Sequence, residues 1–91
     1  MKYQKEIHEK LSENKLMENV INEDTLIKYV IDYGKNQDSF IQVDYFHSDK
    51  TFSVIHVCYE NGKRYFDNRI DYIKTKNDLF NAIEFALGTI K

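Results

Sequence analysis

The sequence has a single cysteine, no proline and no tryptophan, and its three glycines are isolated from one another. One cysteine cannot form a disulfide bond within the chain, and a lone thiol suits a reducing compartment, so we expect a cytoplasmic protein. Isolated glycines exclude a glycine-rich phosphate-binding loop. No stretch approaches the about 18 apolar residues of a transmembrane helix, and the first six residues are mostly polar or charged. We therefore expect neither a secretory signal nor a membrane partner.

The length of 91 residues is enough for one small core, so residues 1–91 are expected to form a single domain. Hydrophobic residues make up 42% of the chain, which is typical of a globular protein rather than a disordered one. The net charge of −2 is too small to indicate a nucleic-acid or membrane partner by itself. Residues 61–76, however, carry five basic and two acidic residues, which gives this segment a local charge of +3.

The dipeptide Asn61-Gly62 lies between two runs rich in β-branched and aromatic residues, and this pattern predicts a β-hairpin. A two-residue loop sets these cross-strand pairs: Glu60 with Lys63, Tyr59 with Arg64, Val57 with Phe66, and His56 with Asp67. Residues 39–46 are predicted to form the preceding strand, with a five-residue loop that places Phe46 opposite Phe52. This register assigns to the core face of the sheet the residues Ile41, Val43, Ile55, Val57, Phe66, Ile70 and Tyr72.

Helices are predicted at both ends of the chain. Residues 2–21 carry apolar residues at helical spacing, in two sets that point in somewhat different directions. Residues 75–88 form the clearest helical pattern, with Thr75 or Asn77 as the N-cap. Residues 25–33 fit either a strand or a helix, and we favour the strand because most of them are enriched in strands. The expected fold is an α+β domain in which an antiparallel β-meander of three or four strands is flanked by an N-terminal and a C-terminal helix.

His56 and Cys58 lie two positions apart on one predicted strand, with Asp67 across the ladder from His56. These residue types occur in Cys-His-Asp nucleophile groups and in metal sites. Side chains at i and i+2 on a strand are about 6.5–7 Å apart, however, and one cysteine with three scattered histidines does not supply four zinc ligands. We interpret the group as a cross-strand His56–Asp67 pair, with Cys58 packed as a small hydrophobic residue. The sequence thus predicts no catalytic, metal-binding or cofactor-binding residue, and no enzyme.

The sheet face opposite the predicted core combines aromatic and basic side chains. Several aromatic residues on one small surface indicate a partner protein, a second copy of the chain, or coverage of this face by the N-terminal helix. Tyrosine and arginine are favoured residues in protein contacts. The residues predicted to bind a partner, including one on the outer side of the C-terminal helix, are Phe46, Phe52, Arg64, Tyr65, Arg69 and Phe85.

Nucleic-acid binding is the alternative function. Aromatic and basic residues interleaved on an exposed sheet can stack on bases, and the order helix, strands, helix resembles that of a double-stranded RNA-binding domain. That family places a lysine cluster at the start of its last helix, whereas here only Lys74 and Lys76 flank Thr75, and Asp78 follows. A pI of 5.9 is also low for a protein that binds single strands. We therefore favour protein binding.

A short, near-neutral chain with a β-meander and flanking helices is similar in plan to small phage-encoded inhibitors, including some anti-CRISPR proteins. The resemblance covers the architecture and the Asn61-Gly62 hairpin followed by the helix over residues 75–88, and it transfers no motif or functional residue. The absence of proline and the abundance of Lys, Asn, Ile, Asp and Tyr fit an AT-rich source, such as a low-GC bacterium or its phages. The resemblance implies a non-enzymatic inhibitor or accessory protein that acts by steric occlusion of a host protein.

Overall fold

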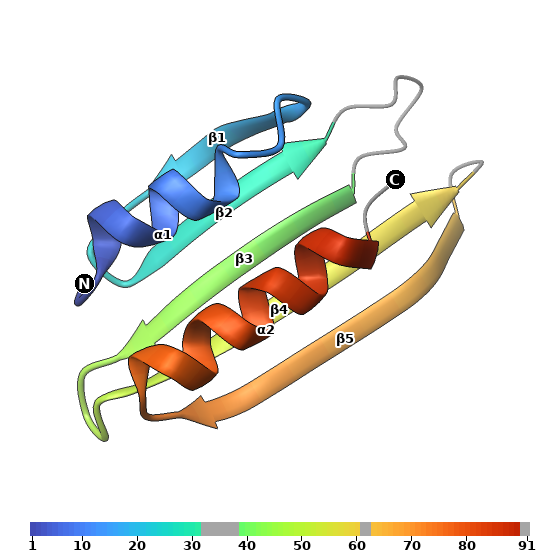
Figure 1. The fold of residues 1–91 in the computed structure, drawn as a ribbon. Helices are drawn as coiled ribbons and strands as arrows, with labels where there is room; N and C mark the ends of the chain where they lie inside the picture. Colours follow the sequence, from blue (N-terminus) through green and yellow to red (C-terminus); the bar gives the residue numbers. More distant parts are fainter. Residues whose placement is uncertain (32–38, 61–62, 90–91) are drawn as a thin grey trace.

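The computed structural model describes residues 1–31, 39–60 and 63–89, without the side chains of Glu60, Tyr65 and Phe66. Within these residues, five strands form one antiparallel sheet in sequence order, with one helix before them and one after (Figure 1). In chain order, the elements are α1 Gln4–Leu11, β1 Met17–Asn22, β2 Leu26–Ile31, β3 Ser39–Phe46, β4 Thr51–Glu60, β5 Lys63–Ile73 and α2 Lys76–Thr89. The predicted α+β fold with an antiparallel meander and two helices is confirmed, although the meander has five strands.

The prediction of one helix over residues 2–21 is wrong, because the second half of this segment forms the edge strand β1. α1 ends at Leu11, and in the turn that follows the side chain of Asn14 accepts a hydrogen bond of 3.0 Å from a backbone N–H two residues later. Asparagine favours such turns because its side chain competes for backbone groups that a helix would use. The β-branched Val20 and Ile21 then favour an extended chain, and β1 pairs antiparallel with β2.

The ambiguous segment forms strand β2, as favoured from the sequence. Ile27, Tyr29 and Ile31 are buried and the residues between them are half-buried, which is the period-two pattern of a strand with one covered face. Tyr29 also connects the sheet to α1, because its hydroxyl lies 2.9 Å from Nδ1 of His8. Residues 32–33 lie outside the described part of the chain.

The turn between β3 and β4 is one residue shorter than predicted, and this changes which side chains of β4 face the core. Phe46 pairs with Thr51 rather than with Phe52, so that the turn contains residues 47–50. Lys50 closes the turn in a left-handed conformation, with φ of 58°. A shift of one residue moves every side chain of a strand to the other face. The core side of β4 therefore consists of Phe52, Val54, His56 and Cys58, and not of Ile55 and Val57.

Strands β4 and β5 pair as predicted only near the hairpin tip. The confirmed pairs are Glu60 with Lys63 and Tyr59 with Arg64, while the predicted Asn61-Gly62 turn lies outside the described residues. A β-bulge between Cys58 and Tyr59 then shifts the register by one residue, which brings Asp67 opposite Val57. The predicted pairs farther from the tip are therefore wrong, namely Val57 with Phe66 and His56 with Asp67.

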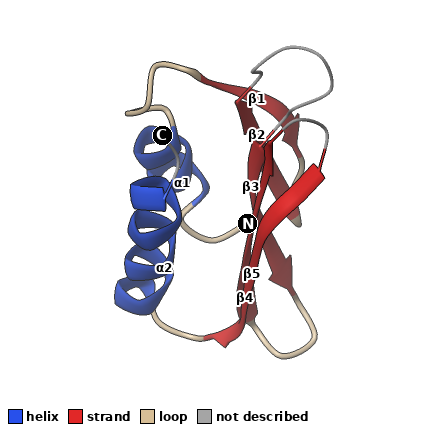
Figure 2. Ribbon diagram, turned by 90° about the vertical axis from the view of Figure 1, so that its right-hand side faces the viewer, coloured by secondary structure: helices blue, strands red, loops and turns tan. Residues whose placement is uncertain are grey.

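Both helices lie on the same face of the sheet (Figure 2). α1 lies over β1 and β2, and α2 lies over β4 (Figure 1). The core between helices and sheet consists of Ile7, Leu11, Met17, Ile27, Tyr29, Ile31, Ile41, Val43, Phe52, Val54, Ile73, Leu79, Ala82, Ile83 and Ala86. None of the described elements covers the opposite face, so the alternative in which the N-terminal helix covers it is wrong.

Helix α2 begins where the sequence predicts. Oγ1 of Thr75 accepts a hydrogen bond of 3.1 Å from the backbone N–H of Asp78, which is the geometry of an N-cap. The helix continues through Gly88 to Thr89, one residue beyond the predicted end. Phe85 lies outside the buried stripe of the helix and is 54% exposed. Among the helices of the described segments, none has the length and apolar character needed to span a membrane.

Candidate protein-binding surface

The uncovered side of the sheet carries the outward-facing side chains of β2 to β5, and we refer to it as the open face. Strand alternation and register assign to it Leu26, Lys28, Val30, Phe40, Gln42, Asp44, Phe46, Thr51, Ser53, Ile55, Val57, Tyr59, Arg64, Asp67, Arg69 and Asp71. The middle of the open face is apolar, because Val30, Phe40 and Val57 stand side by side on three neighbouring strands. Ile55 adjoins them on β4, and we call these four residues the apolar stripe.

The apolar stripe is only partly shielded from solvent. Val57 at its centre is 2% exposed, whereas Val30, Phe40 and Ile55 are half-buried. Nζ of Lys28 lies 4.2 Å from the centroid of the Phe40 ring, which is a cation–π contact. A contiguous apolar area that no described element covers is typical of a surface that contacts another protein.

Each arginine on the outer side of β5 is paired with an aspartate of the same strand. Nη1 of Arg64 lies 3.0 Å from Oδ2 of Asp67, and Nε of Arg69 lies 2.8 Å from Oδ1 of Asp71. The pKa of Asp71 lies below its usual range, mainly because its carboxylate accepts a hydrogen bond from the Ser53 hydroxyl. The hydrogen bond from Arg69 lowers this pKa further. This carboxylate is therefore charged at neutral pH and offsets Arg69. The two arginines of the second hairpin arm are therefore compensated on the open face, and the charge of +3 counted for residues 61–76 comes from Lys63, Lys74 and Lys76.

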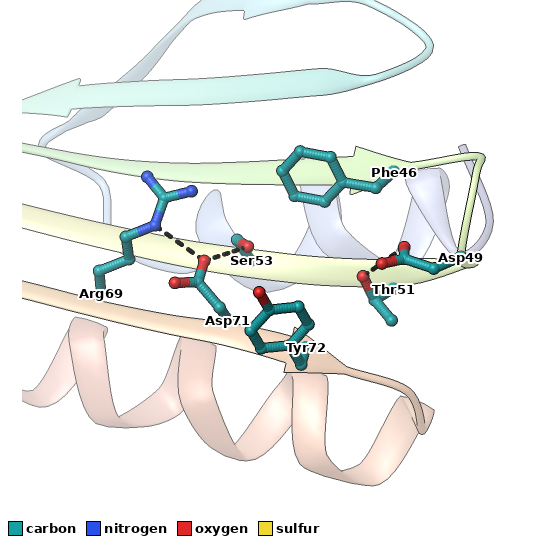
Figure 3. A pocket seen from close by; sticks show the side chains of 7 residues that line it. All are labelled: Phe46, Asp49, Thr51, Ser53, Arg69, Asp71 and Tyr72. Atoms are coloured by element: carbon teal, nitrogen blue, oxygen red, sulfur yellow. Dashed lines mark hydrogen bonds and ion pairs between the residues drawn. The ribbon is translucent and has the colours of Figure 1, made fainter.

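A pocket of about 250 Å³ opens on the open face near the β3–β4 turn (Figure 3). We call it the slot, and its lining consists of Phe46, Asp49, Thr51, Ser53, Arg69, Asp71 and Tyr72. Thr51 and Ser53 from β4 form the floor, while Phe46 from β3 and Tyr72 from β5 stand on either side (Figure 3). The slot exists because small side chains of the middle strand lie between bulky side chains of its two neighbours.

The backbone of Tyr72 is left-handed, with φ of 60°. This conformation costs a residue other than glycine about 1–2 kcal/mol. It coincides with an irregularity in the pairing of β4 with β5, where the register shifts between Phe52 and Val54. The Tyr72 side chain is 76% exposed, so the burial of its ring offsets little of this conformational cost. A strained backbone that holds an exposed aromatic ring beside a pocket is typical of a functional site.

The slot brings together two of the residues that the sequence predicts to bind a partner, Phe46 and Arg69. Arg64 lies farther along β5, near the hairpin tip. Sequence reasoning missed the contribution of Tyr72, which it assigned to the core face. The bulge that turns Tyr72 outward has no glycine at the left-handed position, so no signal in the sequence marks it.

Of the remaining predicted partner-binding residues, Phe52 and Phe85 do not join the slot. The prediction of Phe52 on the exposed face is wrong, because its side chain is buried and its ring lies 4.8 Å from that of Tyr45 in the core. Phe85 is an exposed residue of α2, and this helix lies on the other side of the sheet from the open face. The side chain of Tyr65 lies outside the described part of the structure.

A second cluster of polar side chains lies on the core face, beneath the end of α2. Sγ of Cys58 lies 2.9 Å from Nε2 of His56, so these side chains reach each other, contrary to the prediction. Oγ1 of Thr89 donates to the carbonyl of Ala86 and lies 2.9 Å from Nδ1 of His56. This arrangement fits a neutral ring that carries its proton on Nδ1, and burial favours that form by lowering the pKa of His56. Asp67 lies on the open face and takes no part.

The cluster of His56 and Cys58 is closed to a ligand, because both side chains are almost completely buried. Across the described ranges, no group of three or more His, Cys, Asp or Glu side chains is arranged to hold a metal ion. The thiol and the imidazole therefore contact each other inside the core. The open face and its slot are the better candidates for a functional site.

Comparisons of the chain with protein-family models, with curated proteins and with solved structures each give no match.

Proposed function

We propose that the protein is a small non-enzymatic binding module whose open face docks on another protein. The observation that supports this proposal is the placement of both helices on one side of the sheet, which leaves the apolar stripe uncovered by any described element. Burial of apolar surface in a complex is favourable by about 25 cal/mol per Å². Charged residues such as Lys28, Asp67 and Arg69 surround the stripe, as in the polar rim of a protein interface.

The proposed mode of action is steric occlusion, in which the module covers a surface of its partner and keeps other molecules away from it. This mode requires no catalytic group, so the buried pair of His56 and Cys58 has only a structural role in it. The most concrete form of the proposal is a cytoplasmic inhibitor or accessory protein carried by a phage or mobile element, which is the class that the sequence resembles in plan.

The charges of the open face favour a protein over a nucleic acid as the partner. On and beside this face the described acidic residues outnumber the basic ones, with Asp44, Asp49, Asp67 and Asp71 against Lys28, Arg64 and Arg69. Phosphate binding depends on cations that release counterions from the nucleic acid, and both arginines are already paired. A mobility-shift assay at low salt is expected to show no binding to single- or double-stranded DNA or RNA. A shift that weakens steeply with salt would favour the nucleic-acid alternative.

Two substitutions of a hydrophobic residue by glutamate test the proposal. Ile55→Glu places a charge in the apolar stripe, and Phe85→Glu places the same charge on the exposed side of α2 as a matched control. Partners are captured from cells on each variant and identified by mass spectrometry, after circular dichroism has shown that both variants are folded. The partner retained by the wild type and by Phe85→Glu should be lost with Ile55→Glu. Retention by Ile55→Glu would contradict the proposal.

A second copy of the chain is the alternative occupant of the open face. Sedimentation velocity measures the mass of the wild type and of Ile55→Glu at the same concentration. A dimeric wild type and a monomeric variant would identify the second copy as the partner. A monomeric wild type would leave the open face to a different protein.

A further inference from the structure

The floor of the slot offers a ligand hydrogen-bond acceptors rather than donors. The hydroxyl of Ser53 donates to Oδ1 of Asp71 at 2.5 Å, and the hydroxyl of Thr51 donates to Oδ1 of Asp49 at 2.8 Å. Each hydroxyl has a single hydrogen, so both oxygens present only lone pairs to a ligand. The two carboxylates likewise only accept. A ligand that pairs with this floor must therefore bring its own N–H or O–H donors.

The slot also contains one uncompensated negative charge. Of its three charged residues, Arg69 and Asp71 pair with each other at 2.8 Å. Asp49 forms no ion pair with any described residue. Figure 3 shows Arg69 and Asp49 at opposite ends of the slot, so the Asp49 carboxylate is separated from the Arg69 guanidinium. The Asp49 end of the slot therefore favours a cation.

The sides of the slot suit a flat cationic group. The rings of Phe46 and Tyr72 stand on either side of it, and Phe46 is 40% exposed. Aromatic faces attract cations, and a planar guanidinium can also stack on them. The volume of about 250 Å³ lies below the roughly 300–1,000 Å³ of pockets that enclose a drug-sized ligand. It is therefore suited to a single side chain.

We infer that the slot binds an arginine side chain of the partner protein, with its guanidinium between Phe46 and Tyr72. The group donates hydrogen bonds to the exposed carboxylate of Asp49. This inference rests on the proposed function, since the arginine belongs to the protein that covers the open face. Arginine fits better than lysine because its guanidinium is planar and has five donors. A phosphate or carboxylate would meet a floor of acceptors and the charge of Asp49.

Methylguanidinium is the probe, because it carries the guanidinium group without the rest of a partner. The full-length protein, labelled with ¹⁵N and ¹³C, is titrated at constant ionic strength while amide and aromatic NMR signals are recorded. Saturable shifts are expected in the residues of the slot at millimolar concentrations, with weaker binding of methylammonium and no shifts with acetate. No saturable shift at tens of millimolar methylguanidinium would overturn the inference. Equal binding of methylammonium, or shifts with acetate at Arg69, would overturn the choice of arginine.

Variants with matched controls separate the slot from general electrostatic attraction. Asp49→Asn removes the charge while keeping an acceptor for Thr51, and it should weaken methylguanidinium binding about fivefold. Phe46→Ala removes one aromatic wall and should weaken binding to a similar extent, about fivefold. Asp67→Asn and Phe85→Ala make the same changes outside the slot and should leave the affinity unchanged. Equal weakening by these controls would refute the assignment to the slot.

The outcome of the methylguanidinium titration is independent of the outcome of partner capture with Ile55→Glu. The titration needs no partner protein, so a slot that fails to bind methylguanidinium overturns the arginine site and leaves docking on the open face intact. Retention of the partner by Ile55→Glu would contradict docking on the open face, even if the slot binds methylguanidinium.

Discussion

Two phenylalanines six residues apart, Phe46 and Phe52, should respond very differently to replacement by alanine. Phe52 is buried, and its ring lies 4.8 Å from that of Tyr45 and 6.2 Å from that of Tyr3. Loss of a buried phenylalanine costs about 3–5 kcal/mol, a large part of the about 5–14 kcal/mol expected for a domain of 91 residues. Phe46 is partly exposed on the open face, so Phe46→Ala should cost about 1 kcal/mol or less.

Urea unfolding followed by far-ultraviolet circular dichroism measures both variants under the same conditions. Because the two substitutions delete the same side chain, their difference reports the face on which each ring lies and therefore the register of β3 with β4. The reasoning is refuted if Phe46→Ala is as destabilising as Phe52→Ala. It is also refuted if Phe52→Ala lowers the free energy of unfolding by less than about 1 kcal/mol.

Other residues allow further tests of the fold. Burial lowers the pKa of His56 from its ordinary value of 6.5, so the unfolded chain takes up this proton first as the pH falls. The contribution of neutral His56 to the free energy of unfolding should be fully present above about pH 6.5 and should decrease below it. Urea unfolding across a pH series should therefore show a smaller decrease for His56→Gln than for the wild type. Tyr72→Gly should be about 1 kcal/mol more stable than Tyr72→Ala, because glycine accepts φ of 60° without strain; equal unfolding midpoints would argue against strain. Thr75→Ala should lower the thermal unfolding temperature through a loss of about 1 kcal/mol, since the Asp78 N–H loses its cap, whereas Thr75→Ser should not.

The elements that the sequence predicts correctly have strong periodicity. Residues 39–46 alternate between core and open face, and α2 carries its apolar residues at helical spacing after the Thr75 cap. The prediction of one helix over residues 2–21 was wrong because this segment contains a short helix and a short edge strand. Each carries a few apolar residues, and together these have the spacing of one longer helix. The turn at Asn14 was the signal that separates them.

The face of each residue on β4 and β5 was less predictable than the strands themselves. A turn shorter by one residue after Phe46 and a bulge after Cys58 each shift the pairing by one position. The sequence specifies both features only weakly. The shorter turn alone moves Phe52 into the core and Val57 onto the open face, and the bulge shifts only the alignment of β5 on β4. Phe46 was placed correctly on the open face because β3 alternates regularly, and Arg69 because the bulge after Cys58 offsets the one-residue shift of β4. The exposure of Tyr72 depends on a further irregularity, between Phe52 and Val54.

Site-specific photocrosslinking tests the central claim, that the partner docks on the open face, most directly. The photoreactive amino acid p-benzoylphenylalanine replaces Phe46 on the open face or Phe85 on α2, two partly exposed aromatic residues on opposite sides of the molecule. After irradiation in cells, the partner should be crosslinked through position 46 and not through position 85. Crosslinking of the same partner through position 85 alone would contradict the claim.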